Sequence, residues 1–166
     1  MKKSLSDWAN IAEVISGAAV AITVIFLIIE IRANTEITRV SVYESNINSL
    51  MEWRSLLIED RETAQLWESY TSGEFEELDS TDQLRMLQLV ANNLNIYEKA
   101  YFAQEYGVLG VSEWSRFERM ACVQYGWANQ SQMISTLDMI MTDEFMSFLK
   151  ETCSGKAGWP SDLPTN

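Results

Sequence analysis

The longest apolar stretch of the chain lies near its N-terminus and covers residues 11–31. Residues 14–29 within it carry no charge. As an α-helix, with a rise of about 1.5 Å per residue, the whole stretch would be about 31 Å long, which matches a hydrocarbon core about 30 Å thick. Trp8 precedes it, where an indole ring favours the level of the lipid headgroups. The pattern therefore predicts one transmembrane helix, with residues 1–10 as its N-terminal flank.

Two other interpretations of this stretch stay open. Lys2 and Lys3 provide the basic start of a cleaved signal peptide, but no small-x-small cleavage site follows the apolar run. The uncharged part is also near the lower length limit for a membrane span, so a helix buried in the protein's own core would have a similar pattern. The length of the complete stretch favours the membrane span over both.

One side of the predicted membrane helix differs in chemistry from the rest. Ser16, Thr23 and Glu30 recur every seven residues, and Gly17 and Ala21 form a small-xxx-small pair on the adjacent side. In lipid, small and hydroxylated residues let helices approach closely and hydrogen-bond, so we expect a face that binds another membrane subunit or a second copy. Alternatively, the hydroxyl groups bond to carbonyls of their own helix and Glu30 reaches the membrane interface. The candidate packing residues are Ser16, Gly17, Ala19, Ala21, Thr23 and Glu30.

The following part of the chain, residues 32–153, shows helical periodicity and no strand pattern. Residues 32–59 contain neither proline nor glycine, which predicts that the membrane helix continues into a soluble domain, with a bend at residues 33–35. After a break, a short helix over residues 62–71 is expected to end at Gly73.

Capping residues and glycines divide the rest of the domain. Ser80 and Gln83 form a capping box that opens the most regular helix, and Gly107 ends this helix. The next helix begins at Ser112, and we expect Gly126 to interrupt it.

The C-terminal part is expected to be helical over residues 127–141, with a last short helix that begins after Thr142. Residues 154–166 contain both prolines of the chain and form a tail. The tryptophans expected in the core are Trp53, Trp67 and Trp114.

A carboxylate interrupts the apolar stripe of the helix that begins at Ser80. Glu98 lies between Leu94 and Tyr101, and a buried carboxylate is costly unless it is paired or protonated. Glu98 is therefore a candidate buried carboxylate, acting as a general acid or base or as an ion-binding group. The structural alternative, which we favour, is an ion pair between two helices. The stripe consists of Leu84, Leu87, Ala91, Leu94, Glu98, Tyr101 and Glu105, and the candidate partners are Arg54, Arg116 and Arg119.

Composition argues against several classes of function. The chain has 166 residues and a net charge of −12, and residues 41–166 hold all of this net charge because residues 1–40 are neutral overall. An acidic domain repels nucleic-acid phosphates, so we expect no nucleic-acid partner. The absence of histidine excludes histidine-dependent triads and the common zinc and di-iron sites. We therefore expect no catalytic residue, no metal site and no cofactor.

The two cysteines, Cys122 and Cys153, form no CxxC motif. Isolated cysteines are more often small buried residues than metal ligands or disulfide partners, so we expect both to be buried thiols.

The orientation of the predicted span is nearly balanced. Lys2 and Lys3 precede it, and Arg32 and Arg39 follow it, so the positive-inside rule does not decide. Arg32 directly follows the apolar run, and no disulfide pattern is evident, which favours a cytoplasmic soluble domain.

The string Glu30-Ile31-Arg32-Ala33-Asn34-Thr35 resembles one found in a group of uncharacterised bacterial proteins. In these proteins an N-terminal membrane helix ends in a Q/E-I-R-x-N-T-like string and a helical domain follows. The resemblance covers nearly the whole chain and implies a fold but no activity. This chain has no proline beside Gly126, where those proteins often carry Pro-Gly. Further similar positions are Tyr97, Glu98, Ala100, Tyr101, Gly107, Val108, Leu109, Trp114, Trp127 and Phe145.

These patterns predict an all-α protein in which a single transmembrane helix, residues 11–31, continues into a four- to five-helix bundle over residues 32–153. We expect a non-enzymatic interaction protein, anchored by a single pass in the bacterial inner membrane. Its expected partners are membrane lipid and either other membrane subunits or a second copy. The alternatives are a homo-oligomeric pore lined by the polar face, and an enzyme or ligand-binding bundle that uses Glu98.

Overall fold

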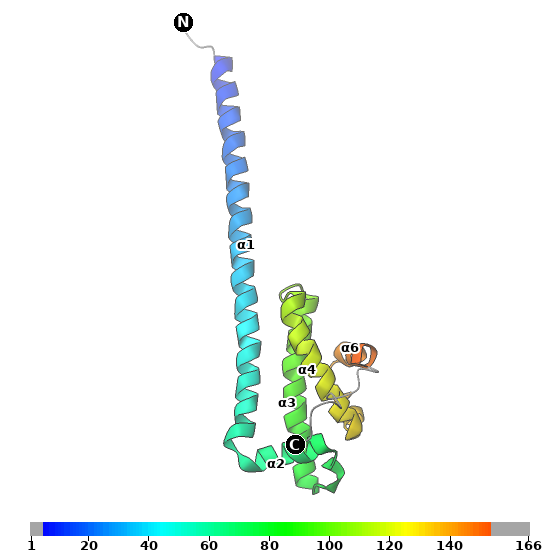
Figure 1. The fold of residues 1–166 in the computed structure, drawn as a ribbon. Helices are drawn as coiled ribbons and strands as arrows, with labels where there is room; N and C mark the ends of the chain where they lie inside the picture. The colour runs from blue at the N-terminus through cyan, green and yellow to red at the C-terminus, as the bar shows by residue number, and fades with distance from the viewer. Residues whose placement is uncertain (1–4, 154–166) are drawn as a thin grey trace. The chain divides into compact units, whose positions relative to one another are not determined.

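The computed structural model describes residues 5–153, and these residues form helices joined by short turns, with no strand (Figure 1). The predicted all-α class is therefore confirmed. The last predicted segment, residues 154–166, lies outside the described residues. The elements are α1 (Leu5–Glu59), α2 (Arg61–Ser72), the 3₁₀ helix η1 (Phe75–Glu77), α3 (Ser80–Glu105), α4 (Val111–Gln130), α5 (Ile134–Leu137) and α6 (Asp143–Cys153).

The chain divides into two compact units, the first ending at Val40 and the second beginning at Ser41. The described part of the first unit is a single helix, the N-terminal part of α1. The second unit contains the rest of α1 and all the other helices, and one hydrophobic core joins them. The long apolar segment and the packed core are thus in different units.

Helix α1 is continuous, and the predicted bend at residues 33–35 is wrong. The Thr35 hydroxyl donates to the Ile31 carbonyl oxygen at 2.8 Å, and the Thr38 hydroxyl donates to the Asn34 carbonyl oxygen at 2.9 Å. These bonds satisfy the polar side chains of Thr35 and Thr38 within the continuous helix.

The break after α1 and the end of α2 agree with the sequence. The Asp60 carboxylate caps α2 by accepting from the Thr63 backbone N–H at 3.0 Å and also from the Thr63 hydroxyl. These hydrogen bonds lower the pKa of Asp60. Gly73 ends the helix with a φ of 87°, a left-handed conformation that glycine adopts without steric cost.

The cap of α3 differs from the prediction by one residue. Asp79, not Ser80, is the N-cap, and one of its carboxylate oxygens accepts from the Thr81 and Asp82 backbone N–H groups at 2.8 and 2.9 Å. Either residue type can cap a helix, so the local sequence did not decide between the two neighbours. Gly107, with a φ of 71°, lies just beyond the C-cap Tyr106 and ends α3 as expected.

Helix α4 passes through Gly126 without interruption, so the predicted break there is wrong. Glycine inside a helix costs only about 1 kcal/mol, and the burial of Gln124 and Ala128 on either side offsets this. The expected continuous helix over residues 127–141 is also wrong. The chain turns at residues 131–133, where Gln132 has a φ of 55°. Between the end of α4 and the start of α6, only the four residues of α5 are α-helical.

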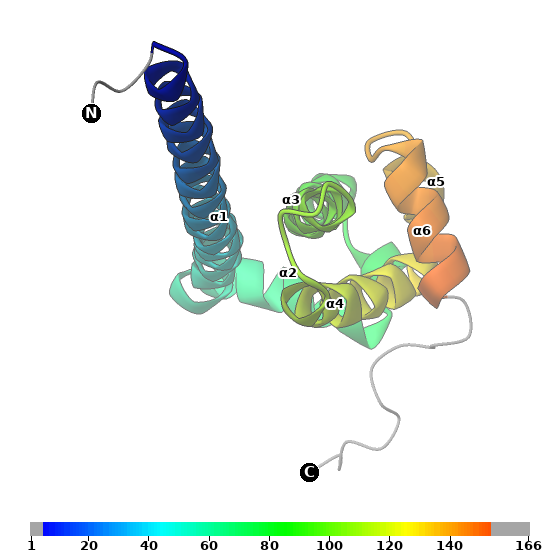
Figure 2. The same ribbon diagram turned by 90° about the horizontal axis from the view of Figure 1, so that it is seen from above.

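The second unit is built around α3. Its buried face is broader than the predicted stripe and includes polar and small residues, while Leu84 is 58% exposed. Trp53 of α1 donates its indole N–H to the Leu89 carbonyl oxygen of α3 at 3.0 Å. Helix α4 contacts both α3 and α6 (Figure 2). Because α1 and α4 both cover α3, a single 3-4 stripe underestimates its buried surface. The buried residues of α3 are Met86, Val90, Ala91, Asn93, Leu94, Tyr97, Ala100 and Tyr101.

The core tryptophans agree largely with the sequence. Trp53 and Trp114 are buried and Trp67 is partly buried. Trp67 joins Trp53, Tyr70 and Trp127 in one aromatic cluster, with ring centroids 4.8, 5.4 and 5.9 Å away. Such tilted and edge-on contacts stabilise the core beyond the effect of burial.

The assignment of the α3 cap leads to a direct stability test. We expect Asp79→Ala to lower the free energy of unfolding by about 1 kcal/mol, because two N–H groups lose their acceptor. Ser80→Ala is the matched control and should change stability by less than about half of that amount. Urea unfolding of the full chain in mild detergent, followed by circular dichroism, measures both. A larger loss for Ser80→Ala than for Asp79→Ala would contradict the assigned cap.

Candidate functional site

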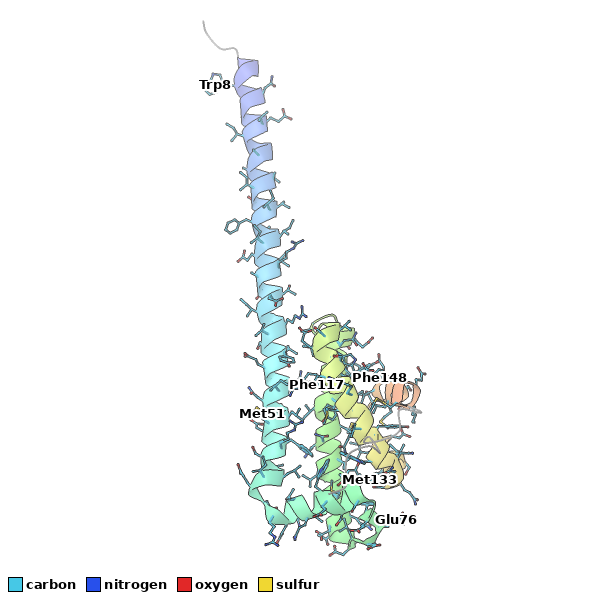
Figure 3. The ribbon with its side chains drawn as sticks, viewed as in Figure 1. Trp8, Met51, Glu76, Phe117, Met133 and Phe148 are labelled. Carbon is cyan, nitrogen blue, oxygen red and sulfur yellow. A yellow bond between two sulfur atoms is a disulfide. The ribbon has the colours of Figure 1, made fainter. Side chains whose placement is uncertain are left out.

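The apolar segment of α1 is exposed along its whole described length. Phe26 is 70% exposed and Val14 is 72% exposed, and the side chains of this segment project freely from the helix (Figure 3). None of the residues in the most apolar 18-residue window of α1 is buried, and this helix is long and apolar enough to cross a membrane. This segment is therefore not a core helix of the described fold. A signal sequence would satisfy the same length and composition criteria.

The structure shows how the predicted polar face is satisfied at one position. The Thr23 hydroxyl donates to the Ala19 carbonyl oxygen at 2.8 Å, as the self-bonding alternative expects. The hydroxyl oxygen of Thr23 can still accept one hydrogen bond from a neighbouring helix. Ser16 and Glu30 are exposed.

The small residues of the predicted packing face leave room for close approach. A Cβ atom placed on Gly17 would meet no atom within 4 Å, and Ala19 and Ala21 are exposed. In lipid, such positions allow two helix backbones to approach closely. Near Glu30 the helix surface is also hollowed. This shallow groove is lined by Leu27, Glu30, Ile31, Ala33, Asn34 and Ile37.

Glu98 does not have the environment that the sequence predicted. Glu98 is partly exposed, so the prediction of a buried carboxylate at this position is wrong. One of its carboxylate oxygens accepts from the backbone N–H and the hydroxyl of Thr142, at 2.8 and 2.7 Å. Thr142 directly precedes α6, and an acidic group is favourable at a helix N-terminus. Glu98 therefore links α3 to the start of α6 by neutral donors, not by one of the predicted arginines.

The two cysteines are buried, as expected, but they form a disulfide, so the expectation of free thiols is wrong. Cys122 of α4 is bonded to Cys153, the last residue of α6. The even number of cysteines was the one sequence signal for this bond, but two residues 31 positions apart give no indication that they meet.

The other polar groups of the described residues do not converge on a reaction centre. Residues 5–153 contain no group of three or more histidine, cysteine or acidic side chains that could hold a metal ion. Arg116, one of the predicted partners of Glu98, instead donates to the Tyr43 hydroxyl at 3.4 Å. The candidate surface with the clearest physical signal is therefore the exposed segment of α1.

Comparisons with known proteins identify no relatives. No family model, no curated protein sequence and no solved structure matches this chain. The resemblance to uncharacterised bacterial membrane proteins thus stays a prediction from short motifs.

The role of Glu98 can be separated from a general effect of charge. Glu98→Ala should lower the free energy of unfolding by about 1 kcal/mol, because the two Thr142 donors at the start of α6 lose their acceptor. Glu105→Ala removes the same charge from the exposed end of α3 and should have little effect. Equal losses in the two variants, measured by urea unfolding, would contradict a specific cap.

Buried tyrosines predict a loss of stability at alkaline pH. Burial raises the pKa of Tyr97 above its ordinary value of 10.0, although a hydrogen bond with Asn93 and the charge of Arg54 partly oppose this. Burial, with the nearby carboxylates Glu105, Glu144 and Glu151, also raises the pKa of Tyr101.

A raised tyrosine pKa means that the folded state keeps a proton that the unfolded state loses above pH 10. The stabilisation is complete below that pH and declines as the pH rises further. Tyr97→Phe should make this decline shallower by up to about 1.4 kcal/mol per pH unit, whereas the exposed Tyr106→Phe should not. Urea unfolding at a series of pH values up to about 11 measures the slopes. Parallel slopes for wild type and Tyr97→Phe would contradict the prediction.

Proposed function

We propose that this chain is a membrane-anchored, non-enzymatic interaction protein, either an accessory subunit of a membrane complex or a homo-oligomer. Its anchor is the helix over residues 11–31, in a single pass through a bacterial inner membrane, and this helix leads into a small helical bundle. The observation that carries the proposal is the fully exposed apolar segment of α1.

The exposure of this segment requires an apolar surrounding. Burial of one Val, Ile, Leu or Phe side chain is favourable by about 1.5–3 kcal/mol, so the exposed run is strongly unfavourable in water. A helix satisfies its backbone hydrogen bonds internally, which makes transfer of the same segment into lipid favourable. The acidic second unit, by contrast, has its own core and a surface suited to water.

The partner surface that we propose is the small and polar face of the membrane helix. Lipid chains are as apolar as leucine, so helices in a membrane associate through close packing and hydrogen bonds. Ala19 is small and exposed and lies one turn before Thr23 on the same side of the helix, so it provides the space for such packing, and Thr23 provides a hydroxyl oxygen that can accept a hydrogen bond. Glu30, at the end of the apolar run, is an exposed carboxylate that a partner can bind.

An enzymatic role has no comparable support. The chain has no histidine, and Glu98 is accounted for by its cap on α6. The pore alternative requires Ser16, Thr23 and Glu30 to face water, and no observation favours it over helix packing.

The proposal is tested by extracting the full chain from membranes in mild detergent and measuring its mass and its bound proteins. We expect an oligomer or a stoichiometric co-purifying membrane protein. Ala19→Leu should weaken this association about tenfold, because a bulkier side chain separates the helices. Ala18→Leu is the matched control, since it makes the same change on another side of the helix.

Two results would count against the proposal. A wild-type chain that is a monodisperse monomer without any bound protein would remove the interaction role. A chain that stays in the aqueous fraction without detergent would remove the membrane anchor.

A further inference from the structure

The disulfide between Cys122 and Cys153 is buried and joins two different helices. The two residues are 6% and 5% exposed, and they belong to the core that also contains Phe117 and Leu149. They are the only cysteines of the chain, so every thiol of the protein is used in this bond.

The bond holds one end of a helix that is otherwise short. Helix α6 has 11 residues, a length at which isolated helices are marginal in water. Its N-terminal end is held on α3 by the bonds between Glu98 and Thr142, and its C-terminal end is held on α4 by the disulfide. Between these two attachments, α6 buries Phe145, Met146 and Leu149. The disulfide is therefore part of how α6 is fixed to the unit.

This environment is that of a structural disulfide. Catalytic and regulatory disulfides exchange through an exposed thiolate, whereas both cysteine residues are buried here. Structural disulfides form and persist in oxidising compartments, whereas the cytosol keeps thiols reduced.

We infer that the second unit, from Ser41 onward, lies on the oxidising side of the membrane, and that the N-terminal flank stays in the cytosol. This inference rests on the proposed membrane anchor. The flanking charges allow it, because Lys2 and Lys3 before the span balance Arg32 and Arg39 after it. The disulfide decides between the two orientations and reverses the cytoplasmic placement of the domain that we predicted from the flanking charges.

Reporter fusions to the C-terminus of the full chain determine the side of the membrane. Alkaline phosphatase folds actively only where its own disulfides form, and a cytosolic green fluorescent protein becomes fluorescent only when it is not exported through the general secretion route. We expect an active phosphatase fusion and a dark fluorescent fusion. A fluorescent fusion together with an inactive phosphatase would overturn the inference.

Thiol trapping of the unfused chain provides an independent measurement. Cells are quenched with acid, and the denatured protein is treated with a maleimide polymer before or after reduction. We expect no adduct before reduction and a gel shift of two adducts after it. Cys122→Ser should give one adduct without reduction, since Cys153 then has no partner, and Cys122→Ser with Cys153→Ser should give none. Two adducts on the unreduced wild-type chain would overturn the inference.

Membrane fractionation of the same cells separates this inference from the proposed anchor. A membrane-bound chain with reduced thiols refutes the orientation but keeps the anchor. A chain that is oxidised and recovered in the soluble fraction outside the cytosol refutes the anchor, while it supports the placement of the second unit on the oxidising side.

Discussion

The exposed apolar surface of the first unit is the constraint on which the other features depend. Residues 14–29 carry no charge, and the apolar side chains of this run stand free around α1. Water cannot stabilise such a surface, and the helix has already satisfied its own backbone groups. Under the proposed membrane anchor, lipid would meet both conditions, and the second unit holds all of the net charge of −12.

The second unit is organised by α3, whose buried face is shared between two neighbours. The last part of α1 contacts it through Trp53, and Lys99 of α3 donates to the Ser45 hydroxyl of α1 at 3.0 Å. On another side, α4 packs on α3 and carries Phe117 and Ala121 into the same core. Residues 41–59 of α1 are thus a part of the core of the second unit, while the apolar segment of the same helix belongs to the first unit.

The sequence is informative where structure depends on neighbouring residues. The break at Asp60 and the ends of helices at Gly73 and Gly107 follow from side-chain capping and left-handed glycine, which are local effects. The apolar run of α1 is equally local. The errors lie where tertiary packing outweighs local preference. Gly126 stays helical inside a buried segment, and the broad face of α3 buries Asn93 but leaves Leu84 exposed.

The attachments of α6 show why the candidate sites were less predictable than the helices. Thr142 and Glu98 are 44 positions apart, and Cys122 and Cys153 are 31 positions apart. No periodicity within α6 encodes either contact, because each depends on where α3 and α4 have placed their own side chains. The position of Glu98 on an apolar stripe therefore suggested that its carboxylate is buried. In the structure this carboxylate instead accepts hydrogen bonds from Thr142 at the start of α6. Two distant cysteines likewise suggested free thiols, although the packing of α6 on α4 brings them together. In this fold the polar and covalent contacts are consequences of helix packing, so they become visible only when the helices are in place.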